Sequence, residues 1–571
     1  MLKRPQSRSL MFAFSIVAVL MLILSACGAT GTPTTSTTPT TGAPVKGGTW
    51  IDDLYEEPHS FIPNGISETF AVLVDQSIFA PLFYGDSQGV VHPGLATEIP
   101  SVTNGDVTAD LKNWTIKLRS NLVWSDGQPL NADDVDFTWR LWDNKKFGAY
   151  STVGYNLITS ADVSADKLSI TFHLRSPFEP FVSIWTDAGF APLPKHVFAS
   201  MAPESILKSP ESLKPSVSSG PFIMSDSKPG DHFTVVKNPK YYRASEGLPY
   251  LDSIVFRIVP DLNTVLKDIQ AGSINSAWFL DVSNTAAYKA VTSYKLVKTP
   301  GSAGFEAMYF NLNDPVLAKN VDVRKAMSMA IDHNALITVA RRGSATPLCT
   351  DHPSSFNPGY QADVVCPTFD QAAANTLLDQ DGWTKGADGV RSKNGQRLEF
   401  LYSTTANNPW RAADELIIQS DLKAIGIKLN IQNYPAGTFF GTVLPTGKTD
   451  KYQLAEFENT FTYDADDSPL LSCTQIPTAA NTYSGGNFSF YCNHAMDPLF
   501  AQELGTTDPK VRQDAFNKIH AIELTDFPFI TYYAPQDIAM AKLNVHNYTP
   551  GPMGASETVN VWTWWCDGGK C

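Results

Sequence analysis

The chain contains a single long apolar stretch, which lies near its N-terminal end. Residues Leu10 to Leu24 carry no charge and include only Ser15 as a polar residue, and Lys3, Arg4 and Arg8 precede them. A helix that crosses a bilayer needs about 20 apolar residues, so this stretch is too short and instead matches the apolar core of a signal peptide. The rest of the chain is therefore expected to fold in contact with water.

A cysteine follows this stretch where a lipid can be attached. Leu24-Ser25-Ala26-Cys27 resembles a bacterial lipobox, with small residues before the cysteine and Leu at the third position back. We expect residues 1–26 to be a lipoprotein signal peptide and Cys27 to be lipidated. The alternatives are an ordinary signal peptide with an incidental cysteine, and an uncleaved anchor helix.

The segment after Cys27 has the composition of a linker. Residues 30–44 include eight Thr, three Pro and two Gly and no charged residue. Because such a segment cannot build a core, we expect residues 27–45 to be a Thr/Pro-rich tether. Cleavage would take Lys+Arg from 43 to 40 against 57 Asp+Glu. An acidic chain of this kind is not expected to bind nucleic acid, because phosphate contacts need a basic surface.

Six cysteines remain after Cys27, an even number in a chain predicted to be exported, where disulfides are permitted. Zinc is the alternative, but no Cys-x-x-Cys pair occurs and no His has ligand spacing, so we expect no metal and no cofactor. Short separations favour three disulfides: Cys349 with Cys366, Cys473 with Cys492, and Cys566 with Cys571.

The body of the chain alternates helical and strand patterns, which indicates an α/β fold. Apolar residues alternate over 114–118 and again over 168–174, so we expect two half-buried strands that pair in a small sheet. Between them Asn131 is a candidate N-cap for a helix whose Trp139 and Trp142 face the core.

Further elements are predicted downstream by the same signals. We expect strands over 233–236, 254–259 and 427–431, a helix from Asp261 or Asn263 to Gly272, a helix through Val323 and Met327, and a helix over 410–425 that ends at Gly426.

Familiar catalytic motifs are absent from the sequence. It has no Gly-x-Ser-x-Gly, His-Glu-x-x-His, Gly-x-x-x-x-Gly-Lys-Ser/Thr or Gly-x-Gly-x-x-Gly pattern. Neighbouring carboxylates occur at Asp464, Asp466 and Asp467, but Pro469 and Gln475 occupy positions where a calcium loop needs Gly and Glu. We therefore expect a protein that is not an enzyme, with a secreted hydrolase using Asp464 as the alternative.

Four blocks in order carry a resemblance to the family 5 solute-binding proteins, the extracytoplasmic receptors of peptide and nickel ABC importers. The likeness runs over nearly all of residues 47–560, and no single block is specific alone. The blocks are Trp114-Thr115-Ile116-Lys117-Leu118-Arg119 with Trp124-Ser125-Asp126-Gly127 and Leu130 to Val135; Gly220-Pro221-Phe222 with Asn238-Pro239-Lys240-Tyr241-Tyr242; Val323 to Ala326 with Ala330-Ile331-Asp332; and Asp421 to Ile427.

The resemblance implies a two-lobed periplasmic-binding-protein fold (class II, cluster C), with the ligand enclosed between the lobes and an extra domain in the first lobe. Hinged closure of two lobes around a ligand is known for such proteins. We expect a lobe 1 core from residues 46–80, 216–304 and 527–571, an extra domain from 81–215, and lobe 2 from 305–526.

The resemblance also implies candidate ligand-binding residues. In peptide-binding relatives an Asp in a loop between the lobes accepts the peptide's ammonium, and Phe461-Thr462-Tyr463-Asp464 followed by Asp466 resembles that loop. Asp464 is the first candidate, although Asp464 and Asp466 are also typical turn-capping residues. The resemblance further implies the Cys473–Cys492 disulfide.

A departure from the family pattern concerns the ligand's carboxylate. Dipeptide-binding relatives place a basic residue before the helix predicted at Trp410, whereas this chain reads Ser403 to Asn408 there, and Arg411 inside the helix start is the candidate substitute. This favours a longer peptide, or a different solute such as a sugar oligomer. The scattered histidines neither support nor exclude a nickel chelate as the solute. Aromatic residues such as Trp383, Trp410, Phe461 and Tyr463 are cavity candidates, with a core role as the alternative for each.

The sequence thus predicts an extracytoplasmic receptor that is held at the cell membrane by its lipid alone and closes around a peptide. We expect it to deliver this cargo to an ABC permease with its ATPase subunits, and to act as a monomer.

Overall fold

The computed structural model describes residues 42–65, 68–299, 302–353, 359–461, 463–464, 466–481, 483–552 and 556–571. The predicted signal peptide, Cys27 and most of the tether lie outside the described residues. No helix within the described ranges combines the length and the apolar character that a membrane span requires.

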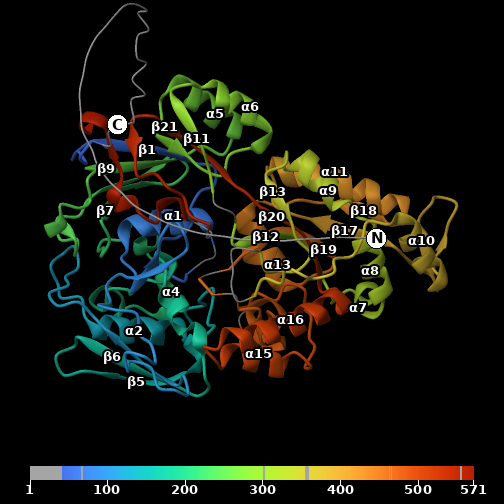
Figure 1. Ribbon diagram of the computed structural model, residues 1–571, viewed down its shortest axis with the longest axis horizontal. Helices are drawn as coiled ribbons and strands as arrows, with labels where there is room; N and C mark the ends of the chain where they lie inside the picture. The colour runs from blue at the N-terminus through green and yellow to red at the C-terminus, as the bar shows by residue number, and fades with distance from the viewer. Residues whose placement is uncertain are drawn as a thin grey trace, which may run out of the picture. The chain divides into compact units, whose positions relative to one another are not determined.

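Within the described residues a seven-stranded sheet forms the core of lobe 1, in the order β11-β21-β10-β1-β9-β8-β7 (Figure 1). β1 runs parallel to β9 and β10, whereas β21, near the C-terminus, is antiparallel to β10 and β11. Distant parts of the chain therefore share one sheet. Its strands are β1 (Thr49–Leu54), β7 (Phe222–Lys228), β8 (His232–Lys237), β9 (Ser253–Ile258), β10 (Ser276–Ala277), β11 (Tyr294–Lys298) and β21 (Ile538–Lys542).

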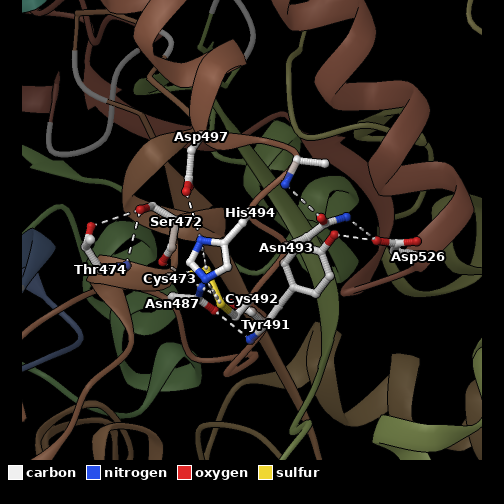
Figure 2. The surroundings of a disulfide bond; sticks show 11 residues. Ser472, Cys473, Thr474, Asn487, Tyr491, Cys492, Asn493, His494, Asp497 and Asp526 are labelled. Carbon is white, nitrogen blue, oxygen red and sulfur yellow. Dashed lines mark hydrogen bonds and ion pairs between the residues drawn. A yellow bond between two sulfur atoms is a disulfide. The ribbon is translucent and has the colours of Figure 1, made fainter.

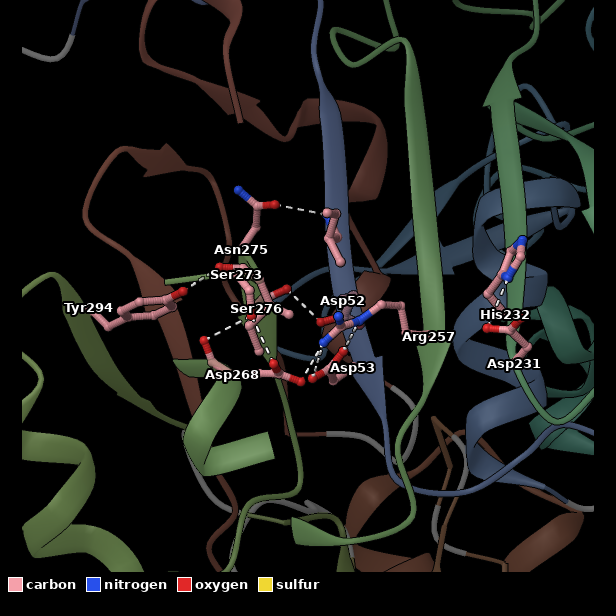
Figure 3. A network of polar contacts seen from close by, with 12 residues as sticks. Asp52, Asp53, Asp231, His232, Arg257, Asp268, Ser273, Asn275, Ser276 and Tyr294 are labelled. Atoms are coloured by element: carbon pink, nitrogen blue, oxygen red, sulfur yellow. Dashed lines mark hydrogen bonds and ion pairs between the residues drawn. The ribbon is translucent and has the colours of Figure 1, made fainter. Parts of the chain in front are cut away.

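Charged groups inside this sheet are paired across strands (Figure 3). Arg257 on β9 donates to Asp53 on β1 at 2.7 Å and to Asp268 on α5 (Leu262–Ala271) at 2.6 Å. Ser276 on β10 donates to buried Asp52 at 2.6 Å. Because an unpaired buried charge is costly, these contacts help to fix the pairing of the central strands.

The extra domain contains the small sheet predicted from the sequence. β4 (Asn113–Lys117) pairs antiparallel with β6 (Ser169–Leu174), which also pairs with β5 (Ile158–Val163). α2 (Ala132–Trp142) begins at Asn131, which forms a capping box with Asp134. Trp139 and Trp142 lie in the domain's hydrophobic core, as predicted.

A second sheet, of six described strands, forms the core of lobe 2 in the order β13-β20-β12-β19-β17-β18. α8 (Val321–Ala330) and α11 (Pro409–Ala424) confirm two predicted helices, and β18 confirms a predicted strand. The sheet's strands are β12 (Gly304–Phe310), β13 (Ala345–Pro347), β17 (Glu399–Ser403), β18 (Lys428–Ile431), β19 (Leu454–Thr460) and β20 (Phe529–Pro535).

The position of β20 differs from the lobe division drawn from the sequence, which assigned residues 527–571 to lobe 1. β20 pairs with β12 and β13, so Phe529–Pro535 belongs to the sheet of lobe 2. Gln536 and Asp537 then lead into β21 in the sheet of lobe 1. The backbone N–H of Thr299 donates to the carbonyl of Asp537 at 3.0 Å, which ties this crossing to the segment that follows β11.

The remaining elements lie in the extra domain, on the faces of the two main sheets and in their connections. The further helices are α1 (Thr69–Ile78), α3 (Lys195–Phe198), α4 (Pro203–Ile206), α6 (Thr285–Ala290), α7 (Pro315–Lys319), α9 (His333–Ala335), α10 (Gln371–Gln380), α12 (Ala436–Thr438), α13 (Leu444–Thr446), α14 (Ser468–Leu471), α15 (Asp497–Leu504) and α16 (Pro509–Asp526). The further strands are β2 (Phe83–Gly85), β3 (Val91–Pro93), β14 (Thr384–Lys385), β15 (Arg391–Lys393), β16 (Gln396–Arg397), β22 (Val545–His546) and β23 (Trp565–Cys566).

Three disulfides join the cysteine pairs that sequence separation favours. They link Cys349 to Cys366, Cys473 to Cys492 and Cys566 to Cys571. Around the second of these, Asn487 donates to the carbonyls of Ser472 at 3.1 Å and Tyr491 at 2.8 Å (Figure 2). The disulfide and this amide together hold the segment that follows the candidate ligand-binding loop.

Candidate functional site: a cavity between the lobes

A cavity lies where the two main sheets face each other, and residues of both lobes line it. We call it the interlobe cavity. Its lining combines aromatic rings with an excess of carboxylates, and its described residues include no His or Cys. Those residues are Tyr55, Glu56, Thr69, Phe70, Trp278, Phe279, Thr299, Ser302, Thr405, Arg411, Phe440, Glu458, Thr460, Asp537, Gly551 and Pro552.

Arg411 provides the positive charge of the cavity wall. It lies in the first turn of α11, whose N-cap Asn408 accepts from the Arg411 backbone N–H. Its guanidinium donates to Glu306 on β12 at 2.9 and 3.3 Å and to Thr405 at 2.8 Å. The structure therefore places this predicted residue at the cavity, with its charge already matched by Glu306.

The carboxylates of the cavity, in contrast to Arg411, are incompletely compensated by charges of the opposite sign. Burial, with the nearby charges of Asp537 and Glu306, raises the pKa of Glu458 on β19 to about 8. Burial also raises the pKa of Glu56. Asp537, on the crossing segment, contacts Arg341 at 3.4 Å. These acidic groups suit a guest that brings a positive charge into the cavity.

Aromatic rings from both lobes meet beside these charges. Phe279 of lobe 1 lies 5.7 Å from Trp410 of lobe 2 between ring centroids, and Phe279 also contacts Phe70 at 6.3 Å. The Arg341 guanidinium lies 5.0 Å from the Trp410 ring centroid. Trp410 is therefore part of the contact between the lobes and lies next to the cavity-lining Arg411, whereas Trp383 lies in the core of lobe 2.

The described residues of the predicted ligand-binding loop are not among those that line the interlobe cavity. Phe461 packs in a lobe 2 core, with its ring 4.9 Å from that of His352. Asp466 accepts from the backbone N–H of Ser468 at 2.8 Å, which is the turn-capping alternative considered for it.

Asp464 is held by a buried arginine. Arg512 on α16 donates to Asp464 at 2.5 and 2.9 Å and to Glu179 of the extra domain at 2.8 Å. Burial and the charge of Asp464 raise the pKa of Glu179 to about 7. Arg512 thus joins lobe 2 to the extra domain through Glu179, and it compensates the charge of Asp464 without a ligand.

Tyr463 makes a second contact between lobe 2 and the extra domain. Its ring packs against Gly85 at the end of β2 so closely that a Cβ atom at this glycine would overlap it. Tyr463 also lines a smaller pocket with Tyr84, Asp187 and Trp562. The predicted loop therefore brings the two sides together, beside the cavity rather than inside it.

Sequence reasoning missed most of the cavity. It singled out Arg411 but not Glu56, Trp278, Phe279 or Glu458. Only Glu458 lies on a strand, β19, whereas Glu56, Trp278 and Phe279 lie in the connections after β1 and β10. No periodicity distinguishes a residue that meets the second lobe from one that meets its own core.

Comparison with known proteins decides the family. A model for the bacterial extracellular solute-binding proteins, family 5 Middle, matches residues 90–477. The chain belongs to this family. The resemblance drawn from the four sequence blocks and the predicted fold class are both confirmed.

Two curated relatives cover most of this family 5 protein. The oligopeptide-binding protein AppA of Bacillus subtilis is 25% identical over 571 residues, 99% of each chain. Protein XP55 of Streptomyces lividans is 25% identical over 460 residues, which cover 80% of this chain and 79% of the relative.

Solved structures share the fold of this family 5 protein. AppA from Bacillus subtilis in complex with a nonapeptide superposes with a TM-score of 0.83 at 21% identity, covering 92% of this chain and 100% of that chain. NikZ from Campylobacter jejuni in complex with Ni(L-His) gives 0.79 at 22% identity, covering 90% and 99%. One fold therefore accommodates guests of different chemistry.

Proposed function

We propose that this family 5 protein is a lipid-anchored, extracytoplasmic receptor of an ABC importer that captures peptides, oligopeptides rather than dipeptides, and delivers them to a membrane permease. The observation that carries the proposal is the interlobe cavity, with aromatic walls from both lobes and the carboxylates Glu56 and Glu458. The apolar side chains of a peptide can pack against the aromatic walls, and its ammonium can pair with these carboxylates.

The state of Arg411 supports a longer peptide. A dipeptide has its carboxylate close to its ammonium, so a receptor of fixed length needs a cation beside the site that binds the ammonium. Among the described lining residues Arg411 is the only Lys or Arg, and Glu306 holds it with two hydrogen bonds. A longer peptide can place its carboxylate elsewhere and does not need this cation.

Binding without covalent chemistry fits the same site. The described lining residues contain no His or Cys, and we propose that the protein is not an enzyme. Closure is driven by contacts that the ligand makes better in the closed state than in the open one. The chain would act as a monomer, with the permease and its ATPase subunits as partners.

The test is to identify the cargo and then measure its effect. Mass spectrometry of the protein released from its producing cells should show co-purifying peptides. In thermal unfolding, a bound peptide at a hundredfold excess over its Kd should stabilise the fold by about 2.7 kcal/mol. Peptides recovered afterwards should be intact.

Other outcomes would replace this proposal. Stabilisation by a nickel chelate or an oligosaccharide, with none from peptides of two to nine residues, would assign a different solute to the same fold. Cleavage that disappears in Asp464→Ala would assign a hydrolase. For the anchor, Cys27→Ser should move the protein from the membrane fraction into the soluble fraction of the producing cells.

A further inference from the structure

A second polar site lies inside lobe 2, apart from the residues that line the interlobe cavity. We call it the buried His–Asp cluster: Asp351, His352, Asp467 and His520. Asp351 and His352 follow Cys349 in the loop closed by the Cys349–Cys366 disulfide, Asp467 precedes α14, and His520 lies on α16. All four side chains are fully buried, with 0% exposure.

The four side chains point their polar atoms at one another. One ligand-capable atom from each residue can be chosen so that all four lie within 4.8 Å of one another. His352 Nε2 lies 2.8 Å from Asp467 Oδ1, His520 Nε2 lies 3.3 Å from Asp351 Oδ1, and the two imidazoles approach to 3.1 Å between His520 Nε2 and His352 Nδ1. In a tetrahedral zinc site with bonds of about 2.0–2.1 Å, neighbouring ligand atoms are about 3.3 Å apart.

Several polar atoms of the cluster lack a partner with hydrogen-bond geometry, although the close contacts above join some of them. Among the described residues, no partner with hydrogen-bond geometry reaches either carboxylate oxygen of Asp351 or Asp467, Nε2 of His352, or Nδ1 of His520. Buried polar atoms of this kind almost always have a partner. The ligand-capable atoms of the four residues converge, and several of them lack a hydrogen bond. This arrangement indicates a bound species that accepts electron pairs.

The surrounding charges point to a cation as that guest. Further buried carboxylates lie nearby, at Glu523, Asp466 and Glu503. Arg512, the neighbouring cation among the described residues, is occupied by Asp464 and Glu179. So much buried negative charge is expensive unless a positive ion or shared protons neutralise it.

We propose that the buried His–Asp cluster binds a divalent metal ion of the zinc class, with Asp351, His352, Asp467 and His520 supplying the ligands. Two imidazoles with two carboxylates suit zinc, whereas calcium and magnesium prefer oxygen ligands alone. His352 has Nε2 near Asp467 and Nδ1 near His520, so one nitrogen can ligate the ion while the other contacts a residue of the cluster. The ion would join the Cys349–Cys366 loop, the loop that carries Asp464, and α16.

The ligands come from distant parts of the sequence. His352 and His520 are separated by 168 positions. The expectation of no metal was drawn from the spacing of ligands in the sequence. Such spacing cannot reveal a site whose ligands come together only in the folded chain.

The experiment uses the full secreted chain, produced without a polyhistidine tag. The protein is unfolded with its disulfides intact in the presence of a chelator, then refolded with Zn²⁺, with Mg²⁺ or Ca²⁺, or without metal. Metal content is measured by elemental mass spectrometry after gel filtration, and the Tm is measured for each sample. We expect one zinc retained per chain and a higher Tm with Zn²⁺ only. A refolded protein that retains well under one equivalent, with an unchanged Tm, would overturn the proposal and leave shared protons as the explanation.

Variants locate the ion. His520→Gln should weaken Zn²⁺ binding by at least about 100-fold, because it removes one of the proposed ligands. The matched control is His494→Gln, an exposed histidine that contacts Asp497 at 2.9 Å beside the Cys473–Cys492 disulfide (Figure 2). The control should retain one zinc. Equal loss in both variants, or in neither, would contradict the site, and if His520→Gln fails to fold, the refolding of the unaltered chain still decides.

Discussion

At the scale of single residues, the carboxylates that face the interlobe cavity determine which guests bind. Glu458 has a pKa raised to about 8 by burial, so the neutral form is favoured at pH 7 before a ligand arrives. A ligand ammonium would favour the ionised form, and binding would release a proton. Taken alone, Glu458 should therefore make the affinity for a guest that keeps its positive charge rise with pH up to about 8 and level off above it.

Glu458→Gln tests this residue directly. The variant should fold normally, because Gln resembles the neutral form, and should bind a peptide with a free N-terminus roughly 10- to 100-fold more weakly. Calorimetry at pH 7.5 in two buffers of different ionisation enthalpy should show less proton release in the variant than in the unaltered protein.

The comparison variant is Asp464→Asn, the residue favoured by the sequence. Since Arg512 already compensates Asp464, the substitution should reduce affinity less than Glu458→Gln does. An N-acetylated peptide separates the two roles. If acetylation weakens binding to the Glu458→Gln variant but makes no difference to the Asp464→Asn variant, the ammonium lies at Asp464 and the sequence assignment is right.

At the scale of helices and strands, local signals predicted a minority of the described elements, those with a clear cap or a clear apolar alternation. Asn131 and Asp261 begin helices because their side chains accept from backbone N–H groups in the first turn. Residue types that cap helices in this way can be recognised in the sequence. The strands at 114–118 and 168–174 show alternation and do pair. By contrast, every residue of β20 is buried, so no alternation indicates which sheet it joins.

The site residues also divide into those that the sequence indicates and those that only the folded structure reveals. Arg411 was named because dipeptide-binding relatives carry a basic residue before this helix and Arg411 is the candidate substitute for it. Glu458 and Trp278 were not, because their role arises only when the lobes meet. The buried His–Asp cluster depends on packing α16 against two loops, which local propensity does not encode.

An element-scale prediction concerns the contact between the extra domain and α16. Glu179 belongs to the extra domain, whereas Arg512 and Asp464 belong to lobe 2. If closure creates this contact, it raises the pKa of Glu179 from 4.5 to about 7, so closing takes up a proton between these values. Taken alone, Glu179 should then lower ligand affinity as the pH rises from about 4.5 to 7, by at most tenfold per unit, which opposes the contribution of Glu458 over this range.

Glu179→Gln should remove that part of the pH dependence, because Gln stays neutral yet can still accept from Arg512. At pH 7.5 the variant should bind the same peptide several-fold more tightly than the unaltered protein, as measured by calorimetry across the pH range. Asp136→Asn is the matched control, since Asp136 contacts Arg140 at 2.9 Å within α2 of the extra domain. An identical pH slope in Glu179→Gln and in the unaltered protein would show that this contact does not change on closure.

At the scale of the whole molecule, binding is proposed to depend on two lobes that close about a short hinge. Only Gln536 and Asp537 separate β20 of lobe 2 from β21 of lobe 1. The segment that follows β11 also passes from lobe 1 to lobe 2 beside these two residues. Its Thr299 hydroxyl accepts from the backbone N–H of Asp537 at 3.1 Å. Changes outside the cavity should therefore alter affinity if they obstruct closure.

Gly85→Ala is such a change. In the structure its Cβ would overlap the ring of Tyr463, so the variant should resist closure and bind peptide at least about tenfold more weakly, while its Tm without ligand changes little. Tyr463→Ala should restore much of the affinity in the Gly85→Ala background, because the smaller side chain leaves room for the added methyl group. Small-angle scattering with and without peptide measures closure in parallel. Equal ligand-induced compaction and affinity in Gly85→Ala and the unaltered protein would mean that capture does not require the two lobes to meet at this point.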